Sequence, residues 1–206
     1  MKKLELLAPA KNCEQGCEAI RHGADAVYIG APAFGARAAV GNSLEDIEKL
    51  VAFAHLYHAK VFATVNTLLF DNEVDEAVKM LWELYHIGVD AAIIQDMGLL
   101  ECELPPIALH ASTQTHNASV ERMKFLQQVG FERVILARET SLETMKRMRE
   151  ETTVELEAVF AVIFAHFARK YVLTKLSGIF TSLCGGHQSP RHHPPGSALV
   201  TSPSSQ

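Results

Sequence analysis

Hydrophobic and acidic positions recur in a fixed order along the first 160 residues. Three times a glycine, any residue and an acidic residue precede a hydrophobic run: GADAVYIG at residues 23–30, GVDAAIIQD at 88–96 and GFERVILARE at 130–139. Glycine commonly ends helices, and short apolar runs are typical of buried strands. Each copy therefore predicts the end of one helix and the start of one strand. The repetition predicts a parallel sheet or barrel.

The same periodicity predicts seven strands and six helices in strict alternation. We expect strands at residues 4–8 (closed by Pro9), 26–30, 60–66, 91–95, 108–112, 133–137 and 154–158. We expect helices at residues 13–22, 43–58, 75–87, 141–151, from 117 or 119 to 129, and briefly after 95 until Pro105.

Polar residues at the predicted helix starts are suited to capping. Asn12 and Ser43 precede the first two helices, and Ser141 precedes the last. For the helix that ends at residue 129, Asn117 and Ser119 are alternative caps. Within the helix at residues 75–87, we expect one apolar face made of Val78, Leu81, Trp82 and Tyr85.

This alternation predicts an α/β fold, an incomplete (β/α)8 TIM-barrel-like domain with about seven parallel strands over residues 1–160. A doubly wound open sheet is the alternative. We favour the barrel because no glycine-rich dinucleotide fingerprint follows an early strand. Parallel barrels place their chemistry at the carboxyl ends of the strands.

Composition changes abruptly after residue 160. The chain has 206 residues and a net charge of −5, yet residues 161–206 contain no Asp or Glu. This segment holds only four basic residues, Arg169, Lys170, Lys175 and Arg191, and is rich in Ser, Pro, Gly and His. We expect residues 161–206 to be an atypical, disordered tail.

Other sequence features predict the cellular setting. No run of about 18 apolar residues exists, so we expect no membrane span. The apolar segment within the N-terminal sequence MKKLELLAPAKN is too short for a secretory signal. The four cysteines lack paired spacing, which favours a reducing, cytoplasmic location.

Polar residues gather where the predicted strands end. Buried polar side chains cost free energy unless they are partnered, so a set of them at strand ends indicates a substrate-binding pocket. The alternative is structural: capping of the following helices, and an ion pair between Arg138 and Glu157. The candidate binding residues are Asn66, Gln95, Asp96, Gln114, His116, Arg138, Glu139 and Glu157.

The spacings of histidines and cysteines in this chain give little indication of a metal site. His110 and His116 are six residues apart, about 20 Å along an extended strand, which is too far to share a metal ion. His55 and His58 on one helix are more typical of surface positions. Cys13 and Cys17 on another are more typical of small core contacts. We predict no metal site.

Several segments together resemble one family. ELLAPA, GADAVYIG, FGARA, LHASTQTH, VILARE and ELEA occur in order over residues 1 to about 158. They resemble the collagenase-like peptidases, family 32 of unassigned catalytic type. The resemblance implies a barrel-like region and a peptidase label. Some relatives take part in hydroxylation of a base in transfer or ribosomal RNA, and carry an iron–sulfur cluster on four cysteines.

The chain departs from the family pattern after ELEA. The family continues with an apolar–His–Gly–Ala segment and two cysteines, whereas this chain reads VFAVIFAHFARKYVL. Cys13, Cys17, Cys102 and Cys184 do not match the cluster positions, so no cluster is expected in this form. Our hypothesis is that a frameshift, a mis-joined frame or a truncation replaced the original continuation.

The main functional expectation is a collagenase-like peptidase that hydrolyses peptide bonds and is truncated and impaired, with no catalytic residue assigned. One alternative is part of a tRNA or rRNA base-hydroxylation protein. The other is a non-catalytic partial barrel. The expected partners are a peptide or RNA substrate and, through an open side of the barrel, a second copy of the chain.

Overall fold

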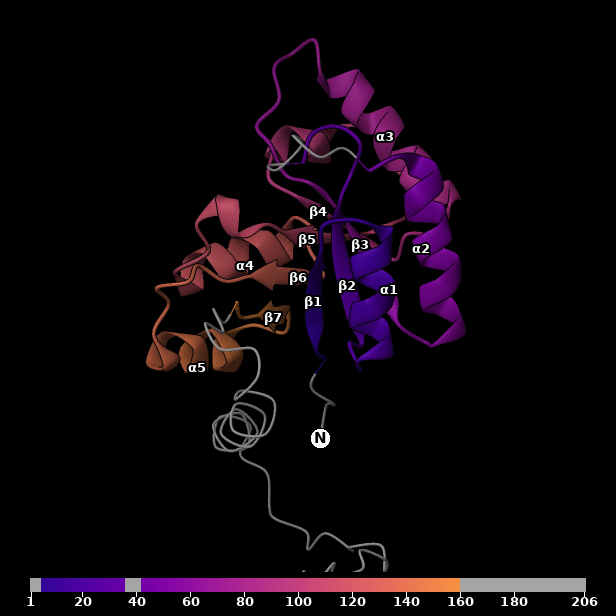
Figure 1. The fold of residues 1–206 in the computed structure, drawn as a ribbon. Coiled ribbons are helices and arrows are strands. Elements are labelled where there is room, and N and C mark those ends of the chain that lie inside the picture. Colours follow the sequence, from indigo (N-terminus) through magenta and orange to yellow (C-terminus); the bar gives the residue numbers. More distant parts are fainter. Residues whose placement is uncertain (1–4, 36–41, 160–206) are drawn as a thin grey trace, which may run out of the picture. The chain divides into compact units, whose positions relative to one another are not determined.

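Seven parallel strands follow one another across a single sheet in the computed structural model, which describes residues 5–35 and 42–159 (Figure 1). Each strand pairs with the next one in the chain, in the order β1-β2-β3-β4-β5-β6-β7. The sheet curls into a half-barrel with helices on its outer side. The predicted tail at residues 161–206 lies outside the described residues.

The alternation of strands and helices is confirmed. The strands are β1 (Leu7–Ala10), β2 (Ala26–Gly30), β3 (Lys60–Val65), β4 (Ala91–Ile94), β5 (Ala108–Ala111), β6 (Arg133–Ile135) and β7 (Glu155–Glu157). The helices are α1 (Cys13–Arg21), α2 (Leu44–Leu56), α3 (Val74–His86), α4 (Val120–Gln128) and α5 (Leu142–Glu151), with short 3-10 helices η2 (Met97–Glu101) and η3 (Thr113–Thr115). None of the described helices is long and apolar enough to cross a bilayer.

The repeated glycine–acid phrase has a structural cause. Gly23, Gly88 and Gly130 follow α1, α3 and α4 with φ angles of 96°, 87° and 101°, which favour glycine. Two residues later the acid binds the start of the preceding strand. Asp25 Oδ2 accepts from Leu6 N at 2.9 Å, and Asp90 Oδ2 accepts from Val61 N at 2.8 Å. The phrase thus ends one helix and aligns two strands.

The third copy of the phrase works differently. The Glu132 side chain is exposed. Gln127 Oε1 instead accepts from Thr153 N at 2.7 Å and from Val154 N at 3.0 Å, just before β7. Gln127 on α4 therefore accepts backbone N–H groups at the start of β7, the role that the acid has at the earlier strands.

The two faces of the sheet have separate cores because successive strand residues point to opposite sides. Outward residues pack against the helices, where Ile47, Leu50, Leu81, Leu84 and Met123 are fully buried. Inward residues form a smaller apolar cluster of Ala26, Phe62, Ala91, Ile93 and Ile135. The sheet is thus covered outside and filled with its own side chains inside.

The first strand begins later than predicted. It was expected at residues 4–8, closed by Pro9, but β1 spans Leu7–Ala10 and includes Pro9. Proline cannot donate a ladder hydrogen bond and is tolerated at a sheet edge. Within the described residues, β1 pairs with β2 alone, so this position is such an edge.

Helix α3 buries a face that only partly matches the predicted one: Leu81 is fully buried and Val78 packs against the core, but Tyr85 is exposed. Its buried residues are Ala77, Met80, Leu81 and Leu84. Trp82 instead lies to one side and donates from Nε1 to the carbonyl of Glu103 at 3.2 Å. The rings of Trp82 and Tyr85 meet edge-on, with their centroids 6.2 Å apart.

The predicted caps hold for most helices. Asn12, Ser43 and Ser141 each accept a backbone N–H of the first turn. Of the two alternatives for α4, Ser119 is the cap, and its Oγ accepts from Arg122 N at 3.3 Å. Asn117 has another role, at the carboxyl end of the sheet.

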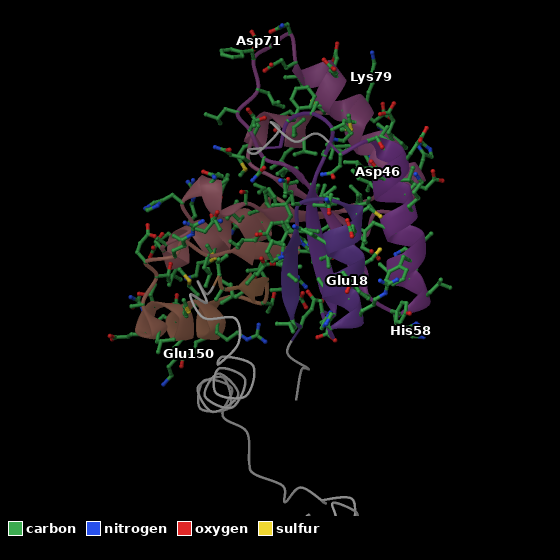
Figure 2. The ribbon with its side chains drawn as sticks, in the orientation of Figure 1. Glu18, Asp46, His58, Asp71, Lys79 and Glu150 are labelled. Atoms are coloured by element: carbon green, nitrogen blue, oxygen red, sulfur yellow. The ribbon has the colours of Figure 1, made fainter. Side chains whose placement is uncertain are left out.

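That end is where each strand passes into its helix. Figure 2 marks both ends of one unit: His58 precedes β3, and Asp71 lies in the loop between β3 and α3. We call the end that carries the loops after the strands the rim.

Candidate functional site

A hollow of about 210 Å³ lies at the rim, where the loops after β5 and β6 meet. We call it the rim pocket. Its lining residues are Thr113, Gln114, His116, Ala137, Arg138 and Glu139. Four of the eight predicted binding residues therefore come together here, two from each loop.

Asn117 joins the two walls of the rim pocket. Its side chain is fully buried, and Nδ2 donates to the carbonyls of Ser112 and Ile135, both at 2.8 Å. In turn, Ala137 N donates to the carbonyl of Asn117 at 3.1 Å, and Thr115 Oγ1 lies 2.7 Å from Asn117 Oδ1. One amide thus holds both loops in place. Sequence reasoning considered Asn117 only as a helix cap, since the partners lie on another strand.

Ser112 connects a third strand end to the same wall. Its buried Oγ accepts from Gln114 N at 3.2 Å, which starts the turn η3. Asn66, the residue after β3, donates to the same Oγ from Nδ2, also at 3.2 Å. Asn66 therefore binds the residue at which the β5 loop of the rim pocket begins.

His116 sits in a backbone conformation that non-glycine residues seldom adopt. Its φ and ψ are 55° and 61°, in the left-handed region. Its side chain is 76% exposed, and Nδ1 lies 3.6 Å from Oε1 of Glu139 on the opposite loop. Strained residues held by buried hydrogen bonds are frequent at binding sites, because the surrounding structure must maintain them.

The other predicted residues lie away from the rim pocket lining. Asp96 connects its own loop to the loop after β3: Oδ1 accepts from Gly98 N at 2.8 Å and Oδ2 from Leu69 N at 2.9 Å. Gln95 is half-buried directly after β4. Glu157 faces the inside of the half-barrel, and its ion-pair partner there is Arg133, at 3.5 Å, instead of the expected Arg138.

Arg133 is the centre of a charged cluster inside the sheet. Its side chain is only 10% exposed and contacts the carboxylates of Glu5 at 2.5 Å and Glu155 at 2.9 Å, besides that of Glu157. The guanidinium also lies 5.1 Å from the centre of the Phe62 ring. Glu5 precedes β1, so this cation connects both edges of the sheet.

Two titratable groups of this interior have unusual pKa values. Burial raises the pKa of Glu157 to about 7, against the lowering effect of Arg133. Burial, and then the charge of Arg133, lowers the pKa of His110 to about 3. His110 Nδ1 is buried and has no hydrogen-bond partner among the described residues, and its ring meets Phe62 edge-on with the ring centroids 4.7 Å apart. His110 is therefore neutral at neutral pH.

Sequence reasoning missed Arg133 and the burial of His110. The available signal was alternation: both side chains occupy inward positions on strands that otherwise carry apolar residues there. Register pairing of His110 with Arg133 places the two on neighbouring strands.

The described residues do not fit an iron–sulfur cluster. Within residues 5–35 and 42–159, no group of three or more His, Cys, Asp or Glu side chains is arranged to hold a metal ion. Cys13 and Cys17 share one face of α1, where burial and then Cys17 raise the pKa of the Cys13 thiol. We therefore assign no step to such a cluster.

Comparison with known proteins gives a consistent family match. The profile described as "Peptidase family U32" matches residues 11–176 of the chain. The chain is 52% identical over 155 residues to the 23S rRNA 5-hydroxycytidine C2501 synthase of Escherichia coli. This alignment covers 75% of the chain and 24% of the synthase. The chain is 36% identical over 161 residues to tRNA hydroxylation protein P1 of Bacillus subtilis, covering 76% of the chain and 38% of that protein.

Solved structures confirm the fold. A U32 peptidase structure superimposes with a TM-score of 0.63 at 14% identity, covering 94% of this chain and 83% of the other. Thiamine phosphate pyrophosphorylase from Pyrococcus furiosus superimposes with a TM-score of 0.54 at 18% identity, covering 77% and 76%. At these identities the likeness concerns the fold alone. The sequence relatives are much longer: the chain spans about a quarter of the synthase and under two fifths of the tRNA hydroxylation protein.

Proposed function

The chain belongs to peptidase family U32, and from this premise we propose that it takes part in hydroxylation of a base in RNA, with a cytidine of 23S rRNA as the substrate. The observation that carries the proposal is the 52% identity to the rRNA synthase over 155 residues. Those residues make up three quarters of the chain.

The rim pocket supports this proposal by its position and chemistry. It lies at the carboxyl ends of parallel strands, where barrel enzymes hold their substrates. Exposed donors and acceptors from two loops line it, and Asn117 fixes both loops. A base that has left its helix needs such hydrogen-bonding groups on its edge.

A chimeric synthase tests the proposal. The 155 aligned residues of this chain would replace the matching segment of the Escherichia coli synthase, in a strain that lacks the native gene. We expect 5-hydroxycytidine to return in 23S rRNA, as measured by mass spectrometry of digested nucleosides. The same chimera with His116→Ala and Glu139→Gln should leave the cytidine unmodified.

The amount of chimera in the cells decides what a lack of 5-hydroxycytidine means. A chimera that accumulates like the native synthase and leaves the rRNA unmodified would contradict the proposal. Immunoblotting of both proteins in the same cultures supplies this comparison.

Peptide-bond hydrolysis is the second candidate function, since the family profile and one solved structure carry a peptidase description. The names of the sequence relatives favour RNA hydroxylation. Gelatin cleavage by the purified chain, lost on substitution of His116, Gln114 or Glu157 by Ala, would support hydrolysis. Cleavage that persists in all three variants would remove these residues as candidates.

A further inference from the structure

We propose that the rim pocket receives an unpaired cytosine base of RNA and that Glu139 distinguishes it from uracil. This inference rests on the proposed function, because the cytidine substrate comes from it. It adds the residue that determines base specificity, which neither the family match nor the relatives' names assign.

The chemistry of the two bases singles out a carboxylate. Cytosine carries an amine at position 4, which donates hydrogen bonds, whereas uracil carries a carbonyl, which accepts them. A carboxylate accepts from the amine of cytosine and repels the carbonyl of uracil. Among the described residues that line the rim pocket, Glu139 alone has a carboxylate.

The neighbouring side chains complement the remaining edge of a pyrimidine. Position 3 of cytosine and the carbonyl at position 2 both accept hydrogen bonds. The guanidinium of Arg138 and the amide of Gln114 are donors in the same lining. Arg138 serves the carbonyl at position 2 of both bases, and the Gln114 amide, which both donates and accepts, can bind position 3 of cytosine or the N3–H of uracil. The difference between the bases therefore rests on Glu139.

The walls of the rim pocket are fixed before any ligand arrives. Asn117 holds the loop of Gln114 to the loop of Arg138 and Glu139 through buried hydrogen bonds. His116 Nδ1 lies 3.6 Å from Glu139 Oε1 on the opposite loop. Preformed sites lose less free energy to ordering when they bind. A single base that has left its helix is the part of an RNA that can enter such a hollow.

Fluorescence anisotropy of the full chain with labelled RNA tests the inference. The first RNA is an oligonucleotide with the sequence around C2501, the cytidine that the rRNA synthase relative is named for. The second is identical except for uridine at that position. We expect the wild-type chain to bind the cytidine RNA at least about fivefold more tightly. Glu139→Gln should remove this preference, because an amide both donates and accepts.

Two further variants and one competitor separate specificity from general binding. Arg138→Ala should weaken binding of both RNAs equally. Glu150→Gln should keep the preference, since Glu150 lies in the last turn of α5, at the end of that helix opposite to the rim (Figure 2). Cytidine monophosphate at the same concentration as the RNA should displace little of it; complete displacement at that concentration would identify a free nucleotide as the ligand and overturn the RNA part of the inference.

The outcomes distinguish this inference from the proposed function. Equal affinity of the wild-type chain for both RNAs would overturn the role of Glu139 and leave the proposed function standing. A preference that survives in Glu139→Gln, with circular dichroism unchanged, would also overturn it. Absence of any RNA binding by the wild-type chain would count against both.

Discussion

Asn117 shows how much of the candidate site depends on a single buried side chain. Its side-chain amide donates to two backbone carbonyls at 2.8 Å, and its side-chain Oδ1 lies 2.7 Å from Thr115 Oγ1. Replacement by Ala would leave the carbonyls of Ser112 and Ile135 buried without this partner. A buried polar group that loses its partner costs more than the original bond contributed.

We therefore predict that Asn117→Ala lowers the free energy of unfolding by about 3 kcal/mol. Ser119→Ala, which removes only an exposed helix cap two residues away, should cost about 1 kcal/mol. Urea denaturation of both variants measures the difference. Equal losses would show that Asn117 is no more than another cap.

Glu157 makes the folding stability of the protein depend on pH. Its pKa is raised from 4.5 to about 7 in the folded state, so the folded protein takes up this proton more readily than the unfolded chain. The stability from this group is fully present below about pH 4.5 and is lost as pH rises through about 7.

His110 has the opposite effect. Its pKa falls from 6.5 to about 3 on folding, so its contribution is present above about pH 6.5 and is lost as pH falls toward about 3. The charged groups that act on Glu157 are Arg133, which lowers its pKa, and Glu5, which raises it.

A comparison at two pH values isolates Glu157. Glu157→Gln removes its titration, so the variant should gain stability relative to the wild type between about pH 5 and about pH 8, by on the order of 1–3 kcal/mol. Urea denaturation of both proteins at each pH gives the four values needed. A difference that stays constant with pH would contradict the raised pKa.

At the scale of elements, the acid of the repeated phrase aligns neighbouring strands. Asp90 Oδ2 accepts from Val61 N at the start of β3 and lies 3.1 Å from His55 Nε2 on α2. We predict that Asp90→Ala lowers the free energy of unfolding by about 1–2 kcal/mol. The matched change in the third copy, Glu132→Ala, should have almost no effect, because that side chain is exposed. Thermal unfolding of both variants tests the contrast; similar losses would refute the alignment role.

Local chemistry was predictable from the sequence, and contacts between distant residues were not. The caps Asn12, Ser43 and Ser141 follow from side chains that bind backbone groups three residues away. Seven strands follow from seven apolar runs. The predicted face of α3 was right at Leu81 and wrong at Trp82 and Tyr85, because hydrophobicity alone ranks these aromatic residues above the buried Ala77.

The candidate site was predictable to a similar extent. The structure places the predicted Gln114, His116, Arg138 and Glu139 together, because parallel strands bring their carboxyl ends to one rim. Their role in binding a substrate stays a prediction. The role of Asn117 and the choice of Arg133 as partner of Glu157 depend on strand register, which a single sequence does not reveal.

At the scale of the whole molecule, the two outer strands define its open side. In the described part of the chain, β1 and β7 each pair with one neighbour. An unpaired strand edge can bind another strand. Arg133 ties the segment before β1 to β7, but its ion pairs do not supply backbone hydrogen bonds to either edge.

We predict from these edges that the chain associates with itself. Light scattering after size-exclusion chromatography should show a mass that rises with protein concentration toward twice the 22.7 kDa of one chain. A mass that stays at one chain across the whole concentration range would contradict this prediction.

Crosslinking tests the central claim, that the rim pocket is an RNA-binding site, most directly. The full chain would be irradiated with the cytidine RNA, digested, and analysed by mass spectrometry for peptides that carry a nucleotide. The account predicts crosslinks within residues 112–117 and 137–139, the two loops that form the rim pocket. Crosslinks confined to the outer helices, with none in these two loops, would contradict it.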